Sequence, residues 1–548
     1  MTHPARTALL LILAVALCAG LSGGLPSAGR AGVPPWGPAG PFPERYDLRD
    51  EGLVTAVLEQ KGFSTCAFMA ATCALESSLL RSEGVLLDLS VNNLANHTGS
   101  LLRFEGMAPS ELAAAYYARW EGPVPARDDP YPRPGESPDY LRAVRHVQEI
   151  LFLPPREGPY DNDAVKWAVS AYGAVDAAMD FSADAEDGFW NVDTRSYYST
   201  RDELDHHVSC VGWDDAYPAS RFATRPPGDG AFLIKNSWGT DWGDDGYFWI
   251  SYHDAGFGDA LAVFSRVAAA DDFDAIYQYD ALGRSGWAGL GGERAWYANR
   301  FRCAGSGAVT AVAFYTPVPG AAYEVRVAGS VSGVSAAPVA AAGTVAVPGY
   351  HTVRLERPAA VTTGSTFVAA VRVTTPGWAQ PVPVERHSEL IAPRARRGQS
   401  YVSADGLAWT DLVTRPGDAR SNVCLKAFVD APGDGDTRPP RVSVVASDAG
   451  EDGRASVRWA LADPAFSSAS AVVVLEARDG KGTLLSKRRI PAVAVGERGL
   501  WTLPAGWPDG AYTVSGRAYD VAGNRQTAPV VAVVVIRDAA RRAAGGGR

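Results

Sequence analysis

The sequence has few of the residues that build disulfide scaffolds and metal centres. It contains six cysteines and eight histidines in 548 residues, with no C-x-x-C pair and no cluster of histidine and cysteine. Such sparse cysteines exclude a disulfide framework, and the missing clusters exclude the common structural zinc sites. We therefore expect no metal and no other cofactor.

Basic charge and long apolar segments are also scarce. The formal net charge is −10, and no useful basic run occurs before the extreme C-terminus. Proteins that bind nucleic acid normally carry a basic patch, so we expect no nucleic-acid partner. After the N-terminal region no segment is long enough to cross a bilayer, so we expect no membrane association once that region is removed.

The N-terminal region has the pattern of a secretory signal. Arg6 precedes an apolar run from Ala8 to Leu21, which small residues follow. The run is short for a membrane span, which favours a cleaved signal. We expect a signal peptide over residues 1–31, a Pro/Gly-rich leader over residues 32–44, and a secreted or cell-surface protein.

The remaining chain divides into three units. Residues 45–268 are helical first and β-rich later, which indicates an α+β domain. Residues 272–430 consist of short β-rich runs separated by Gly/Pro turns, and residues 431–440 form a linker. Alternating strands over residues 441–537 suit a small β-sandwich, before a disordered tail over residues 538–548. The predicted fold class is therefore multidomain, an α+β domain followed by two all-β, sandwich-like domains.

The stretch Leu58–Leu80 is the centre of the first unit. Ser64 and Thr65 stand where a helix N-cap belongs, and the chain is almost wholly apolar from Cys66 to Leu75. This predicts a buried helix that begins at Cys66. A cysteine in the first turn meets the positive end of the helix dipole, which favours the thiolate.

Other helices and strands follow from the same patterns. Apolar spacing predicts helices over residues 110–120 and 163–172, with a strand within residues 173–181. The runs His206–Gly212 and Ala231–Asn236 read as strands, separated by a loop dense in turn residues. If they pair antiparallel about residue 221, His206 lies opposite Asn236.

Four polar residues then suggest one catalytic site. A thiol such as Cys66 needs a neighbouring base, and the His206 imidazole can take its proton and pass it to a leaving amine. The Asn236 amide can orient that ring. Gln60, six residues before the cysteine, can direct its side-chain amide at a developing oxyanion beside the backbone N–H of Cys66.

These residues occur in motifs that resemble the papain family of cysteine peptidases. They are QKGFSTC around Cys66, DHHVSCVGW around His206, and NSWGTDWGDDGYFWI from Asn236, with Glu76 at the family spacing. The resemblance implies the same four roles, and it implies that Trp238 covers the His–Asn bond. His207 is a competing base, but the family pattern places the catalytic histidine directly after Asp, which favours His206.

The match has departures that keep an alternative function open. Ala67 stands where the family has a Trp after the nucleophile, and Phe63 replaces a half-cystine. Loss of the indole leaves space beside the thiol. The first hypothesis is a secreted cysteine endopeptidase that acts on protein or peptide substrates. The alternative is a surface or cell-wall binding protein that carries a weakened or inactive papain-like domain.

The second unit resembles the lectin-like domain that follows bacterial secreted peptidases of this type. The segments YQYDALGRSGW and SNVCLKAF are among those that carry the resemblance. It implies a possible carbohydrate or cell-wall ligand, although Trp287, Trp296 and Trp378 are better interpreted as core residues than as sugar platforms. Cys303 and Cys424 could form a disulfide in an oxidising compartment, and the sequence does not decide between the bridged and the free form. The third unit resembles immunoglobulin-like or fibronectin-like repeats.

Overall fold

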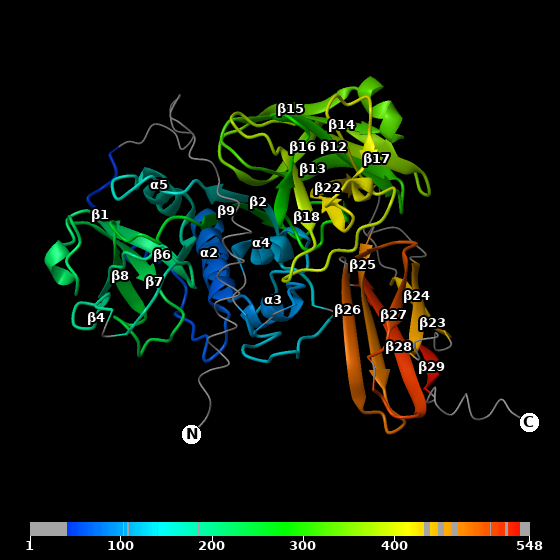
Figure 1. The fold of residues 1–548 in the computed structure, drawn as a ribbon, viewed down its shortest axis with the longest axis horizontal. Helices are drawn as coiled ribbons and strands as arrows, with labels where there is room; N and C mark the ends of the chain where they lie inside the picture. Colours follow the sequence, from blue (N-terminus) through cyan, green and yellow to red (C-terminus); the bar gives the residue numbers. More distant parts are fainter. Residues whose placement is uncertain are drawn as a thin grey trace, which may run out of the picture.

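The structure is a computed structural model that describes residues 41–101, 104–106, 109–139, 141–184, 187–431, 439–447, 454–462, 470–504, 506–520 and 524–536. The predicted signal peptide, most of the leader and linker, and the C-terminal tail lie outside the described residues. The described chain forms a first unit (residues 42–269), a second unit (275–430) and a third unit (441–536), coloured from blue to red along the chain (Figure 1).

The first unit places helices and a sheet around a central helix, α2. The helices are α2 (Cys66–Glu83), α3 (Val91–His97), α4 (Ser110–Ala118) and α5 (Asp163–Tyr172). The strands are β1 (Arg45–Asp47), β2 (Arg145–Leu153), β3 (Val175–Met179), β4 (Trp190–Asn191), β5 (Ser196–Tyr197), β6 (His206–Asp214), β7 (Ala231–Lys235), β8 (Tyr247–Ser251) and β9 (Leu261–Ala269). The predicted helices at 66, 110 and 163 and the strand near 175 are confirmed, whereas α3 was not predicted.

Helix α2 is central because nearly all of its faces are apolar or small. Its residues are buried from Cys66 to Leu79, and it packs against β3, β6 and β9 as well as α4. The helix ends at Gly84, whose φ of 67° is the left-handed conformation that glycine adopts readily. A helix buried on all sides matches its uniformly apolar sequence.

The second unit is a sandwich of short antiparallel strands. Its elements are β10 (Ala275–Tyr277), β11 (Gly286–Ala288), β12 (Arg294–Arg302), β13 (Gly307–Thr316), β14 (Ala321–Ala328), β15 (Val339–Val345), β16 (Gly349–Val361), β17 (Thr366–Thr374), β18 (Val382–Arg386), β19 (Ser400–Ser403), β20 (Thr410–Asp411), β21 (Ser421–Val423) and β22 (Leu425–Asp430). One face is a six-stranded sheet in the order β15-β14-β17-β12-β19-β20. Its core includes Tyr297, Phe314 and Phe367.

The first and second units share one continuous β-sheet. Strand β16 of the second unit pairs antiparallel with β2 of the first, with Tyr350 opposite Ile150 and His351 opposite Glu149. The path β10-β22-β13-β16-β2-β9-β3-β6-β7-β8-β5-β4 therefore runs through both units. His351 Nδ1 and Glu149 Oε1 lie 3.0 Å apart at this junction. A single apolar cluster also spans the units, from Phe68 on α2 to Phe428 on β22.

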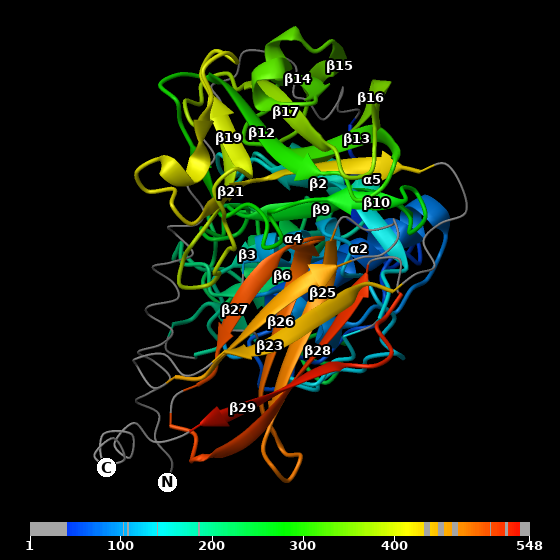
Figure 2. The ribbon, with the colours of Figure 1, turned by 90° about the vertical axis from the view of Figure 1, so that its right-hand side faces the viewer.

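The third unit is a β-sandwich beside the other two (Figures 1 and 2). It contains β23 (Arg441–Ser447), β24 (Ser456–Ala462), β25 (Ser470–Arg478), β26 (Leu484–Ala494), β27 (Arg498–Thr502), β28 (Gly510–Asp520) and β29 (Val530–Ile536). The sheets β23-β24-β27 and β26-β25-β28-β29 enclose Trp459, Leu475 and Trp501. The predicted fold class, an α+β unit followed by two all-β units, is confirmed.

The cysteines and tryptophans that the sequence left open are now placed. Cys303 and Cys424 are free, so the possible disulfide does not form, and the Cys303 thiol donates to the carbonyl of Gly305 at 2.8 Å. Trp287 and Trp296 are buried, as a core role requires. Within the described ranges, no helix combines the length and apolar character needed to cross a membrane.

Candidate active site

Cys66 is the first residue of α2 and is almost completely buried, with 4% of its surface exposed. Thr65 occupies the N-cap position, but its side chain makes no capping bond to the helix backbone. Its hydroxyl instead lies 2.8 Å from the hydroxyl of Tyr131. The start of the helix is therefore fixed by a contact with a distant loop.

His206 and Asn236 are hydrogen-bonded beneath a tryptophan. His206 Nε2 lies 2.8 Å from Asn236 Oδ1, and both side chains are buried. The Trp238 ring stacks on the imidazole, with ring centroids 4.8 Å apart and an angle of 28° between planes. The Trp238 ring therefore lies against the imidazole; that it shields the His–Asn bond from water stays a prediction. Because Nε2 is engaged, Nδ1 is the ring nitrogen that remains for a thiol.

The predicted strand register was wrong, although the predicted contact forms. Strands β6 and β7 are antiparallel, but Ser209 pairs with Lys235, and a bulge lies between Cys210 and Gly212. Asn236 comes after the end of β7, where its N–H donates to the carbonyl of Gly246 at 2.9 Å. The His206–Asn236 contact is therefore made by a residue just beyond the end of β7, not by a cross-strand pair. The pairing is centred later than residue 221 on both sides of the bulge, so a symmetric turn at residue 221 does not predict it.

Gln60 lies in the loop before α2, and both the oxygen and the nitrogen of its side-chain amide are hydrogen-bonded. Its Oε1 accepts from Ser237 Oγ at 2.8 Å and from Trp238 Nε1 at 3.1 Å. Its Nε2 donates to the carbonyl of Phe63 at 2.7 Å. An amide nitrogen carries two hydrogens, so one remains for a substrate oxygen. The bonds to Oε1 also fix which end of the amide faces outward.

Tyr131 belongs to this site and was missed by sequence reasoning. Its hydroxyl donates to the Gln60 carbonyl at 2.8 Å, besides its contact with Thr65. Its ring stacks on Phe104 and meets Phe63 edge-on. The residue stands between two prolines in an irregular loop, where no periodic pattern marks it. The only available signal was an aromatic residue in a turn-rich segment.

The neighbouring histidine, His207, has different partners from His206. Its Nδ1 lies 3.1 Å from Asp176 Oδ1 and 3.3 Å from Ser110 Oγ. Asp176 stands on β3, where it pairs with Ser209, two residues along β6 from His207. His206 and His207 therefore face opposite sides of the sheet, as strand alternation predicts. Only His206 is bonded to Asn236.

Burial keeps both reactive groups neutral. It raises the pKa of the Cys66 thiol to about 11, although backbone groups of His207 and Ala67 act in the opposite direction. It lowers the pKa of His206 to about 4, against the effect of the bond to Asn236. The thiolate expected from the helix N-terminus is therefore not favoured at pH 7, because desolvation of the charged sulfur outweighs the helix dipole.

Ala67, the residue after the thiol, is 1% exposed and lies within the packed start of α2. The expected open space beside the thiol stays a prediction. Among the residues that the structure describes, no group of three or more histidine, cysteine, aspartate or glutamate side chains is arranged to hold a metal ion.

Comparison with known proteins identifies the domains. Residues 42–261 match the family model described as papain family cysteine protease, and residues 276–429 match the one described as lectin like domain. The chain therefore carries a papain-family cysteine protease domain, formed by the first unit, followed by a lectin-like domain, formed by the second.

Individual relatives agree with this assignment. The chain is 31% identical to procathepsin L of Felis catus over 213 residues, which cover 38% of this chain and 60% of the relative. It is 29% identical to cathepsin L of Sarcophaga peregrina over 211 residues, covering 37% and 58%. The chain thus spans less than two thirds of these relatives.

A solved structure has the same pair of domains. The cysteine protease and lectin-like domains of Cwp84, a surface layer associated protein of Clostridium difficile, superpose with a TM-score of 0.62. The sequences are 24% identical, and the match covers 72% of this chain and 90% of the other. The two proteins therefore share a fold across both the first and second units.

Proposed function

We propose that the chain is a secreted cysteine endopeptidase with Cys66 as nucleophile, His206 as base and acid, Asn236 as orienting residue and Gln60 as oxyanion donor. The observation that carries the proposal is the buried 2.8 Å bond between His206 and Asn236 under Trp238. It leaves the opposite ring nitrogen for the thiol. The family match and the cathepsin relatives support the same reaction.

The proposed reaction begins from a neutral pair. As a peptide carbonyl approaches, the Cys66 proton moves to His206 Nδ1 and the sulfur bonds to the carbonyl carbon. The oxyanion accepts hydrogen bonds from the backbone N–H of Cys66 and from Gln60 Nε2. The imidazolium gives its proton to the leaving amine, which produces a thioester. Water, deprotonated by His206, then releases the acid and restores the thiol.

Covalent labelling tests the proposal directly. E-64, an epoxysuccinyl inhibitor, should modify Cys66 and stop hydrolysis of a peptide library, as located by mass spectrometry. Cys66→Ala should abolish both labelling and hydrolysis. Cys303→Ala is the matched control, because Cys303 is also a buried free cysteine but lies in the second unit. Hydrolysis that is equal in wild type and Cys66→Ala would exclude the proposal.

A second candidate is a surface or cell-wall binding protein with an inactive first unit. Ala67 in place of the family Trp is the observation that favours it. The second unit would then carry the function, through a carbohydrate or cell-wall ligand that its lectin-like fold suggests. Binding of cell-wall material by a full chain that neither labels nor hydrolyses would support this candidate. Secretion is proposed in both cases, on the signal pattern in residues 1–31.

A further inference from the structure

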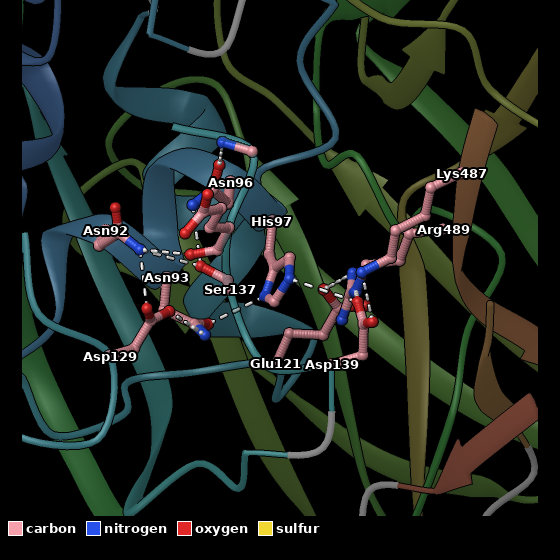
Figure 3. A network of polar contacts seen from close by, with 12 residues as sticks. Asn92, Asn93, Asn96, His97, Glu121, Asp129, Ser137, Asp139, Lys487 and Arg489 are labelled. Atoms are coloured by element: carbon pink, nitrogen blue, oxygen red, sulfur yellow. Dashed lines mark hydrogen bonds and ion pairs between the residues drawn. The ribbon is translucent and has the colours of Figure 1, made fainter. Parts of the chain in front are cut away.

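The third unit contacts the first through charged side chains, several of them largely buried (Figure 3). Arg489 of β26 donates from Nη1 to Glu121 Oε2 at 2.8 Å, and its Nε lies 3.5 Å from Asp139 Oδ1. Lys487 Nζ lies 2.6 Å from Asp139 Oδ2. The side chains of Glu121, Asp139 and Arg489 are only 5%, 11% and 13% exposed. The Arg489–Glu121 pair is not a solvent-exposed pair that contributes little, because a buried charge is costly without its partner; the Lys487 side chain is more exposed, at 30%.

Glu121 is itself anchored within the first unit. Arg119, which is buried, donates from Nη2 to Glu121 Oε2 at 3.0 Å and from Nη1 to the carbonyl of Ala281 at 2.8 Å. Burial alone would raise the pKa of Glu121, but Arg119 and Arg489 together hold it below its usual value. The carboxylate therefore stays charged and receives one arginine from each unit.

The third unit also contacts the second unit, and there the third unit supplies the acidic side chain and the second unit the basic ones. Glu497, in the turn between β26 and β27, accepts from Arg394 Nη1 and Arg396 Nη2, both at 2.9 Å. Basic residues of β26 thus face acidic residues of the first unit, while Glu497 faces basic residues of the second. This charge complementarity specifies one docked position.

Asp139 ends a segment, residues 129–139, that is fastened to α3 (Figure 3). Three asparagine side chains of α3 bond to this segment at 2.7–2.9 Å: Asn92 and Asn93 to the carboxylate of Asp129, and Asn96 to the hydroxyl of Ser137. His97 Nε2 lies 3.7 Å from Asp139 Oδ1. Residues 129–139 are therefore bonded to α3 and also contact the third unit.

The same segment carries Tyr131 to the candidate active site. Its hydroxyl bonds the Gln60 carbonyl and the Thr65 hydroxyl, the residues that flank the loop before Cys66. Contacts from Lys487 and Arg489 thus reach Asp139, and the backbone of residues 129–139 connects Asp139 to Tyr131 and its bond to the proposed oxyanion donor.

We propose that the third unit is a positioning element of the active site: by holding Asp139 it orders residues 129–139 and keeps Tyr131 against Gln60. The inference rests on the proposed function, since its catalytic consequence requires a peptidase. The structural part of the inference, that docking of the third unit orders residues 129–139, does not depend on the proposed function. Tyr131 acts through Gln60 and Thr65 and is a positioning residue.

A charge-reversal variant of the full chain tests docking. Lys487→Glu with Arg489→Glu should speed backbone hydrogen exchange in residues 129–139 and lower kcat about 2- to 30-fold, with KM much less affected. The control is Arg458→Glu with Lys481→Glu, which makes the same charge change at exposed positions of the third unit. Exchange that stays at the wild-type rate in the Lys487/Arg489 variant would overturn the proposal.

A second variant tests whether loss of docking and loss of the Tyr131 hydroxyl lower activity through the same loop or independently. Tyr131→Phe removes only the hydroxyl and should lower kcat while leaving the third unit docked. Combined with the reversal of Lys487 and Arg489, it should add little, because both changes release the same loop. Fully additive losses would overturn the proposal. If the wild type hydrolyses no peptide, faster exchange in the reversal variant still supports ordering by docking, and only the proposed function fails.

Discussion

His206 is the residue whose surroundings set the pH range of the proposed reaction. Burial lowers its pKa to about 4, so the ring stays neutral and able to accept a proton down to that pH. Below it the ring is protonated and cannot serve as a base. We therefore expect the acid limb of kcat/KM near pH 4, below the pKa of about 6.5 of an ordinary histidine.

Asn236→Asp should move this limb upward. A carboxylate beside Nε2 stabilises the imidazolium and raises the pKa of His206, so activity should be lost at higher pH as the solution is acidified. Measurement of kcat/KM from pH 3 to pH 8 in wild type and variant checks the shift. An acid limb at the same pH in both proteins would contradict the assigned role of Asn236.

Trp238 makes two contacts that substitution can separate. Trp238→Ala removes both the ring over His206 and the Nε1 donor to Gln60, so we expect kcat/KM to fall roughly 10- to 100-fold, equivalent to about 1.5–3 kcal/mol. Trp238→Phe keeps an aromatic ring and loses only the donor, and should retain more activity. Steady-state kinetics on one peptide substrate distinguishes the two. Equal losses would assign the whole effect to the hydrogen bond.

At the level of elements, the junction of β2 and β16 depends on Gly349. A Cβ at this position would lie 2.0 Å from the carbonyl oxygen of Ile150, and the φ of 151° also favours glycine. Gly349→Ala should destabilise the protein by about 1–3 kcal/mol more than Gly364→Ala, whose φ is 78° but whose Cβ meets open space. Chemical unfolding of both variants checks this. A smaller loss for Gly349→Ala would show that the junction relaxes freely.

The elements also show what local sequence can and cannot predict. The start of α2 at Cys66 was predictable because the apolar run begins there and acts within a few residues, although the Thr65 side chain makes no capping bond. The His206–Asn236 contact was predictable because its motifs are specific. The β6–β7 register was not, because the long loop between the strands is not centred on residue 221 and a bulge lies between Cys210 and Gly212. Tyr131 was not, because its partners lie 66 and 71 residues earlier in the chain.

At the scale of the whole molecule, the first and second units are expected to unfold together. The cluster around α2 includes Trp287, Tyr315, Tyr350 and Phe428 of the second unit. A chain that ends at residue 269 should therefore expose apolar surface, bind a hydrophobic dye and lack a cooperative thermal transition. A chain that ends at residue 431 should keep that transition in calorimetry. A cooperative transition in the shorter chain would contradict the shared core.

The shared sheet affects the order in which the first unit can fold during synthesis. Synthesis proceeds from the N-terminus, so β2 and β9 emerge before β16, whose first residue comes 80 positions after the end of β9 (349 − 269). At about 5–20 residues per second, this interval lasts roughly 4–16 s. Throughout it the edge of β2 has no partner and the core around α2 is incomplete. We therefore expect the core of the proposed protease domain to be completed only after β16 of the lectin-like domain has been synthesised.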